Sequence, residues 1–267
     1  MPVVQTDDNA KIYYWTLGNG PLALLLLHGW AGAGSGHSWR QVLPHLPLDG
    51  IRIVVVDQRG HGGSSAGSAA FTTDRLVEDV IAVADDAGAT RFLTVAFSMS
   101  GKWAQALAVK YPERLWGQIL VAPVPLAAFP VPEEMSREWI RITRDRVLFE
   151  KFIHGFTKQK LLPETMDEYF HDASTTSEIT LAETLGVCSR EDLGGLRCER
   201  PVKTLVCAGA HDPMFTLASL QKAIGATFSE CRWAELDCGH ELPIENPREL
   251  AGLIENFVST LPAESYP

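Results

Sequence analysis

Ser98, Asp212 and His240 are three side chains that could act together in nucleophilic catalysis, and each comes shortly after an apolar run. A serine hydroxyl is a weak nucleophile until a base removes its proton. A histidine can be that base near neutral pH, and a carboxylate fixes the tautomer of the histidine and stabilises its imidazolium form. The order serine, aspartate, histidine is one of several chain orders that give this triad. We therefore expect these residues to be catalytic.

The residues around Ser98 favour this serine as the nucleophile. Ala96 and Ser100, two positions before and after it, are small, and Gly101 follows. A serine on a sharp turn from a strand to a helix needs small neighbours there, because they approach each other closely. Ser100 fits less well, because Lys102 would then occupy the second small position. The alternative is that Ser98 or Ser100 only caps the next helix.

Asp212 and His240 are weaker signals when each is taken alone. Pro213 favours an extended conformation at Asp212, but an aspartate before a proline is also a common surface turn. His240 follows Gly239 in a loop before the last predicted helix, where a histidine can be incidental. Their order and their positions after strands, taken together with Ser98, point to catalysis.

The elements that must position these residues alternate along the chain. A hairpin is predicted at 3–6 and 11–17, followed by apolar strands at 22–27, 51–56, 92–96, 118–121, 203–208 and 231–236. Runs that are apolar at every position are typical of strands covered on both faces. Helical periodicity occurs at 74–87, 101–110 and 248–260. We expect an α/β fold: a mostly parallel eight-stranded sheet with helices on both faces.

The segment 124–200 interrupts this alternation and shows no strand pattern. Helix-like stretches lie at 134–144, 147–156, 164–171 and 180–188, between a proline-rich start and Pro201. We interpret the segment as a helical cap, or lid, inserted between strands 6 and 7. Residues 1–123 and 201–267 would then form the core domain.

With two further motifs, the whole chain resembles the α/β-hydrolase superfamily. The Leu-His-Gly-Trp stretch at 27–30 is similar to the oxyanion-loop motif of the family, and 57–64 matches the Asp-x-Arg-Gly-x-Gly-x-Ser pattern of many members. The resemblance implies an oxyanion hole formed by the backbone N–H groups of Trp30 and Met99. Donors of this kind each contribute about 3–4 kcal/mol of transition-state stabilisation.

The resemblance also implies that His28, Asp57 and Arg59 brace the loops around the site. The usual Gly-x-Ser-x-Gly is replaced by Ala-Phe-Ser-Met-Ser at 96–100, which keeps the turn and leaves the role of Ser100 open. The glycines at 32, 34 and 36 lack the ending of a phosphate-binding loop. We expect them to form a flexible rim beside the oxyanion loop.

The expected activity is hydrolysis of a carboxylic ester or lactone of a small, apolar or aromatic substrate, through an acyl-enzyme and without a metal or cofactor. Serine rather than aspartate at the nucleophile position disfavours the haloalkane dehalogenase and epoxide hydrolase branches. The candidates for substrate contact are Trp30, Phe129, Trp139, Phe152 and Met214. Aromatic residues of the cap could instead form only its own core.

Two other functions stay open. Similar triads serve C–C bond hydrolysis, thioester hydrolysis and cofactor-free haloperoxidase or perhydrolase chemistry, and the fold does not separate these reactions. Some small-molecule receptors resemble the family, keep the triad and have a serine at the position of Ser100. The stretch 57–64 resembles the enzymes more than those receptors.

Composition excludes several other classes of protein. The 267 residues include 23 Lys and Arg against 33 Asp and Glu, a formal net charge of −10, which disfavours binding to nucleic acid through phosphate attraction. No secretory signal is visible at the start, and the longest apolar run, 22–27, is far shorter than the ~20 residues of a membrane helix. We expect a cytoplasmic protein with a small-molecule substrate. No pattern distinguishes a monomer from a homo-oligomer.

The cysteines do not suggest a framework of disulfides. They lie at 188, 198, 207, 231 and 238, an odd number without a repeating spacing. A zinc site made of Cys231, Cys238 and His240 is conceivable, but a paired C-x-x-C is absent, so buried reduced thiols are the preferred interpretation.

Overall fold

A computed structural model describes residues 2–261, which contain an eight-stranded sheet in the order β1-β2-β4-β3-β5-β6-β7-β8. Strand β2 pairs antiparallel both with β1 and with β4, and the remaining pairs, from β4 through β3, β5, β6 and β7 to β8, are parallel. The predicted mostly parallel α/β sheet is therefore confirmed. The strands are β1 (Val3–Gln5), β2 (Lys11–Leu17), β3 (Leu22–Leu27), β4 (Ile51–Asp57), β5 (Phe92–Phe97), β6 (Leu115–Val121), β7 (Thr204–Gly209) and β8 (Cys231–Leu236). Residues 1 and 262–267 of the predicted core domain lie outside the described residues.

The central strands are buried on both faces. In β3, Leu25 and Leu27 belong to one hydrophobic cluster, whereas Leu24 and Leu26 belong to another. Successive side chains of a strand point to opposite faces of the sheet. The run at 22–27 is apolar at every position because both faces of the sheet are covered there, so apolar and polar residues do not alternate.

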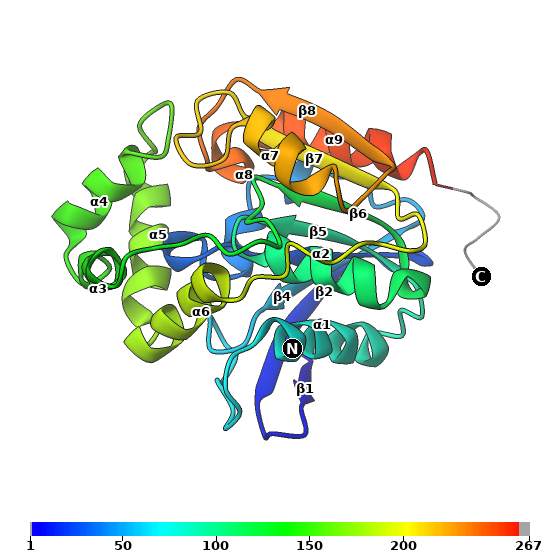
Figure 1. Cartoon of the computed structure of the whole chain (residues 1–267), viewed down its shortest axis with the longest axis horizontal. Helices are drawn as coiled ribbons and strands as arrows, with labels where there is room; N and C mark the ends of the chain where they lie inside the picture. The colour runs from blue at the N-terminus through cyan, green and yellow to red at the C-terminus, as the bar shows by residue number, and fades with distance from the viewer. Residues whose placement is uncertain (1, 262–267) are drawn as a thin grey trace.

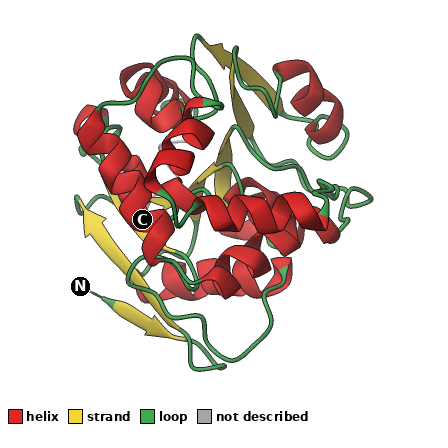
Figure 2. Cartoon of the chain, turned by 90° about the vertical axis from the view of Figure 1, so that its left-hand side faces the viewer, coloured by secondary structure: helices red, strands yellow, loops and turns green. Residues whose placement is uncertain are grey.

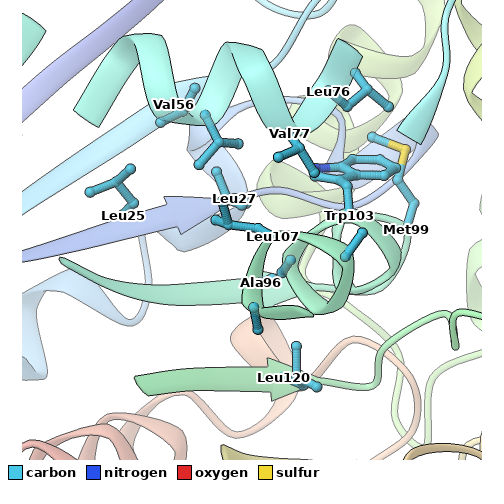
Figure 3. Close-up of a cluster of buried hydrophobic side chains, with 14 of the residues drawn as sticks. Leu25, Leu27, Val56, Leu76, Val77, Ala96, Met99, Trp103, Leu107 and Leu120 are labelled. Atoms are coloured by element: carbon cyan, nitrogen blue, oxygen red, sulfur yellow. The ribbon is translucent and has the colours of Figure 1, made fainter. Parts of the chain in front are cut away.

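Helices supply both covers. Helices α1 (Thr73–Asp86), α2 (Ser100–Lys110) and α7 (Leu217–Ile224) contribute to the first cluster, and α9 (Pro247–Val258) contributes to the second. Figure 3 shows side chains of α1 and α2 meeting over the sheet, with Trp103 beside Leu76 and Val77. Because α2 begins two residues after Ser98, this packing fixes the turn that carries the serine.

Four helices lie between β6 and β7 along the chain, in the segment 124–200 that we call the helical insertion. They are α3 (Glu133–Ile142), α4 (Arg146–His154), α5 (Pro163–Thr175) and α6 (Glu178–Arg190). They gather at one side of the sheet, on the left in Figure 1. Figure 2 faces that side and shows helices in the middle of the view, with strands between and behind them. No described helix is long and apolar enough to cross a membrane.

The expected flexible rim of glycines is wrong, because Gly32, Gly34 and Gly36 are buried in or beside short 3-10 helices at Ala31–Ala33 and Gly36–Trp39. A Cβ atom added to Gly32 would lie 2.7 Å from Cδ1 of Tyr169 and 2.8 Å from Cζ of Phe149. The glycine therefore permits a close approach between the loop after β3 and the helical insertion. Other short helices also lack a predicted counterpart: α7, α8 (Leu242–Glu245) and 3-10 helices at Leu43–His45 and Pro112–Arg114.

Candidate active site

The structure brings Ser98, His240 and Asp212 into one hydrogen-bonded row. Nε2 of His240 lies 2.9 Å from Oγ of Ser98, and Nδ1 of His240 lies 2.7 Å from Oδ2 of Asp212. An ionised carboxylate only accepts hydrogen bonds, so the proton sits on Nδ1 and leaves Nε2 as the acceptor. In this tautomer His240 can take the hydroxyl proton of Ser98.

The backbone of Ser98 is strained and firmly held. Its φ is +54°, in the left-handed region that residues other than glycine rarely adopt. The N–H of Ser98 donates to the carbonyl of Val121 at 2.9 Å, and its carbonyl accepts from the N–H groups of Gly101 at 3.0 Å and Val124 at 2.9 Å. A Cβ atom on Gly101 would lie 2.3 Å from Cβ of Pro123, so no side chain fits there. These contacts hold the serine at the tip of the turn between β5 and α2.

Ser100 is buried beneath that turn. Its hydroxyl is 2.9 Å from the carbonyl oxygen of Phe97 and 3.1 Å from that of Leu27, at the carboxyl ends of β5 and β3. The side chain does not line the cavity that contains Ser98. The hydroxyl of Ser100 therefore ties the turn to two strands, and Ser98 is the serine that reaches His240.

The carboxylate of Asp212 is buried and fully partnered. Oδ1 accepts from the backbone N–H groups of Met214 at 2.7 Å and Phe215 at 3.1 Å, while Oδ2 faces His240. Burial favours a higher pKa for Asp212, but the hydrogen bonds outweigh it, that of His240 above all, and the pKa lies below its ordinary value. Burial is the largest single influence on the pKa of His240 and favours a lower value, yet the hydrogen bond with Asp212 and the negative charges of Asp212, Glu241 and Glu245 together outweigh it and raise the pKa. Asp212 is thus an anion that stabilises the imidazolium form of His240.

The helical insertion helps to position His240. The N–H of His240 donates to the carbonyl of Phe156, in the loop after α4, at 2.7 Å. The carboxylate of Glu245 accepts from the N–H of Gly239 at 2.9 Å and from that of Lys158 at 2.7 Å. The loop after β8 and the loop after α4 are therefore joined directly beside the catalytic candidate.

Two backbone N–H groups beside the candidate nucleophile have no acceptor within residues 2–261: those of Trp30, after β3, and Met99, at the start of α2. Both residues line the same cavity as the serine. His28 braces the loop of Trp30, because Nε2 accepts from the N–H of Gln58 at 2.9 Å and Nδ1 donates to the carbonyl of Gly29 at 2.8 Å. Burial lowers the pKa of His28 to about 4, so the ring is neutral. The two free N–H groups are available to a negative charge that forms on a substrate.

Asp57 and Arg59 hold loops outside the cavity. Oδ1 of Asp57 accepts from the N–H of Gly36 at 2.8 Å. Arg59 is fully buried and pairs with Asp8 at 2.6 Å and with Asp79 at 2.7 Å. Neither Asp57 nor Arg59 is in the cavity wall, and their contacts are those of bracing residues.

The cavity lies where the sheet meets the helical insertion. Its wall includes Ser98 and His240, with Asp212 behind them, and all five side chains predicted to contact substrate: Trp30, Phe129, Trp139, Phe152 and Met214. Glu241 also lines the cavity, although the motifs do not single it out. The one signal in the sequence is a carboxylate directly after the candidate histidine.

The five cysteines are free thiols. Cys188 lines the cavity, and burial raises its pKa to about 12. Within residues 2–261 no group of three or more histidine, cysteine, aspartate or glutamate side chains could hold a metal ion. The ring nitrogens of His240 are instead occupied by Ser98 and Asp212.

Comparisons with known proteins identify the fold and the family of the chain. Pyrrolizixenacetamide deacetylase of Xenorhabdus hominickii is 28% identical over 97% of this chain and 98% of its own length. The 3-oxoadipate enol-lactonase 2 of Acinetobacter baylyi is 26% identical over 81% of both chains. The solved structure of an esterase from Exiguobacterium antarcticum shares the fold, with a TM-score of 0.85 at 18% identity over 97% of this chain and 99% of that one. The α/β hydrolase fold model matches residues 23–247, and the chain therefore belongs to the α/β hydrolase family.

Proposed function

We propose that this protein is a serine hydrolase that cleaves a carboxylic ester or lactone through an acyl-enzyme. The observation that carries the proposal is the row of hydrogen bonds from Ser98 through His240 to Asp212, which opens into a cavity beside two free backbone N–H groups. Relatives named a deacetylase and an enol-lactonase support hydrolysis at a carbonyl group.

The geometry suits a two-step reaction. Oγ of Ser98 forms a bond to the carbonyl carbon while Nε2 of His240 takes its proton, and the carbonyl oxygen becomes an oxyanion near the N–H groups of Trp30 and Met99. The bond to the leaving oxygen then breaks, and His240 gives it the proton. Water repeats the sequence at the acyl-enzyme, releases the carboxylic acid and restores Ser98.

The cavity wall indicates the kind of substrate. Aromatic and aliphatic side chains from the sheet edge and the helical insertion make up most of it, so we propose an ester or lactone with a small apolar or aromatic body. We further propose that 124–200 acts as a cap over a core of 1–123 and 201–267. Free thiols at all five cysteines support the cytoplasmic location that we propose.

Labelling with a fluorophosphonate probe tests the nucleophile. We expect covalent labelling of the wild type and of Ser100→Ala, and no labelling of Ser98→Ala. Turnover of p-nitrophenyl esters by Ser98→Ala should fall by roughly a thousandfold or more, because the binding groups remain but the nucleophile is lost. Wild-type turnover in Ser98→Ala, or labelling that follows Ser100, would refute the assignment. A parallel panel of lactones and acyl thioesters identifies the preferred bond.

A further inference from the structure

Glu241 is unusual among the carboxylates around the cavity. Of the described residues that line it, Glu241 alone carries a carboxylate, and none is lysine or arginine. The residue is only 6% exposed. A charged group so deeply buried requires partners, because burial removes its hydration.

The neighbouring carboxylates have these partners, and Glu241 lacks most of them. Asp212 accepts from two backbone N–H groups and faces His240. Glu245 accepts on Oε1 from one backbone N–H group and on Oε2 from another. Glu241 has a single donor within residues 2–261, the hydroxyl of Tyr169, which is 2.9 Å from Oε2.

The second oxygen of Glu241 is the one left to a ligand. Oε1 has no donor among residues 2–261. It is nevertheless accessible, because it is absent from the set of fully enclosed polar atoms without a partner. Burial raises the pKa of Glu241, although His240 and the hydroxyl of Tyr169 oppose the shift. A positively charged donor beside Oε1 would supply the missing hydrogen bond and favour the ionised form.

The aromatic side chains of the same cavity are suited to a cation. Four aromatic rings that line it follow one another in contact: the centroid separations are 6.4 Å for Trp30 and Trp139, 5.8 Å for Trp139 and Phe152, and 5.0 Å for Phe152 and Phe156. Aromatic faces attract ammonium groups while they also bind an apolar body. The net charge of −10 adds a long-range attraction for positively charged substrates.

We propose that the cavity takes substrates with a protonated amine, and that Glu241 accepts a hydrogen bond from this ammonium group. The inference rests on the proposed ester hydrolysis and narrows its substrate class: an apolar ester or lactone that also bears an amine. Glu241 then determines substrate specificity, while Ser98, His240 and Asp212 cleave the ester bond.

Matched pairs of esters test this inference. One member is an ω-(dimethylamino)alkyl acetate, protonated at pH 7, and the other is the hydrocarbon with CH in place of the nitrogen, such as 3-methylbutyl acetate. Spacers of two to four methylene groups vary the separation between the ester and the amine. For at least one spacer we expect wild-type kcat/KM to favour the amine by about tenfold or more, as for a charge-assisted hydrogen bond.

The variants assign the preference to the carboxylate. Glu241→Gln keeps the shape and should abolish the preference while the hydrocarbon ester is still hydrolysed. Tyr169→Phe is the matched control: it removes the hydroxyl but keeps the carboxylate, so the preference should persist. The inference is overturned if the wild type shows no preference for the amine with any spacer, or if Glu241→Gln retains the preference.

Failure of this inference is distinguishable from failure of the proposed function. Hydrolysis of the hydrocarbon acetates without any amine preference would leave the proposed function standing and reject the role of Glu241. If no ester is hydrolysed at all, the proposed function fails. Calorimetric titration of the Ser98→Ala protein with each pair then decides the role of Glu241, because tighter binding of the amine supports it and equal binding rejects it.

Discussion

The indole N–H of Trp30 donates to the carbonyl oxygen of Leu181 across 3.1 Å. Trp30 provides one of the two free backbone N–H groups beside Ser98, whereas Leu181 belongs to α6 of the helical insertion. The next residue, Ala31, has a φ of +53°, so the loop is held in a conformation with few alternatives. The candidate oxyanion donor is therefore positioned partly by the helices that also form the wall of the cavity.

Trp30→Phe tests this connection, because phenylalanine keeps an aromatic ring and removes the indole donor. A neutral hydrogen bond contributes about 1 kcal/mol, and we expect kcat for an ester to fall by about fivefold as the loop loses its tie. Trp139→Phe is the control: it changes the neighbouring ring but leaves the hydrogen bond to Leu181. An unchanged kcat in Trp30→Phe would show that the loop is fixed without this contact.

The pH dependence of activity follows from the pKa of His240. Only the neutral ring accepts the proton of Ser98, so activity is lost as the pH falls through the pKa of His240. Burial lowers this pKa, but the hydrogen bond with Asp212 and the nearby negative charges together outweigh burial and raise it. We therefore expect kcat/KM to reach half its maximum at a pH above about 6.5, the ordinary value for histidine.

Asp212→Asn provides the complementary measurement. Removal of the anion should move the acidic limb of the pH profile to lower pH, because burial then acts on the His240 ring with less opposition. The loss of the correct tautomer should also lower kcat by roughly 10⁴-fold. If the acidic limb of the pH profile does not move in Asp212→Asn, the limb reflects the titration of a group other than His240.

Lys102 carries a prediction about stability. Its side chain is fully buried on α2, and Nζ donates to the carbonyl oxygens of Leu126 at 2.9 Å, Ala127 at 3.2 Å and Glu191 at 2.5 Å. These carbonyls lie on both connections of the helical insertion, so one ammonium group joins its two ends to the helix that follows Ser98.

Lys102→Met would remove this donor from the carbonyls of Ala127 and Glu191, whereas that of Leu126 keeps the N–H of Leu193 at 3.0 Å. We expect the free energy of unfolding in urea to fall by about 2–4 kcal/mol. Lys110→Met, on the same helix, is the control. Lys110 is partly exposed and pairs with the exposed Asp74, so its loss should cost under about 1 kcal/mol. Equal losses in the two variants would contradict the role given to Lys102.

The sheet and the catalytic candidates could be predicted because their signals are local. The apolar run 22–27 is a property of one strand, and the small residues around Ser98 are required by one turn. The roles of Glu241 and Lys102 could not be predicted, because they depend on tertiary contacts. Glu241 has few hydrogen-bond donors around it, and Lys102 binds carbonyl groups from two connections that are distant in the sequence. Gly32 was misinterpreted for the same reason, since the ring that requires a glycine there belongs to Tyr169, more than a hundred residues away along the chain.

The close approach at Gly32 gives the last prediction. A methyl group there would lie 2.7 Å from the ring of Tyr169 and 2.8 Å from that of Phe149, so Gly32→Ala must push the helical insertion away from the loop of Trp30. We expect this overpacking to lower the free energy of unfolding by about 1–3 kcal/mol and to raise KM. Gly252→Ala in α9 is the matched control: its Cβ meets nothing within 4 Å, and alanine in a helix should stabilise the fold by about 0.5–1 kcal/mol. If both variants were stabilised, Gly32 would not be a packing requirement, and the approach of the insertion to the loop would be adjustable.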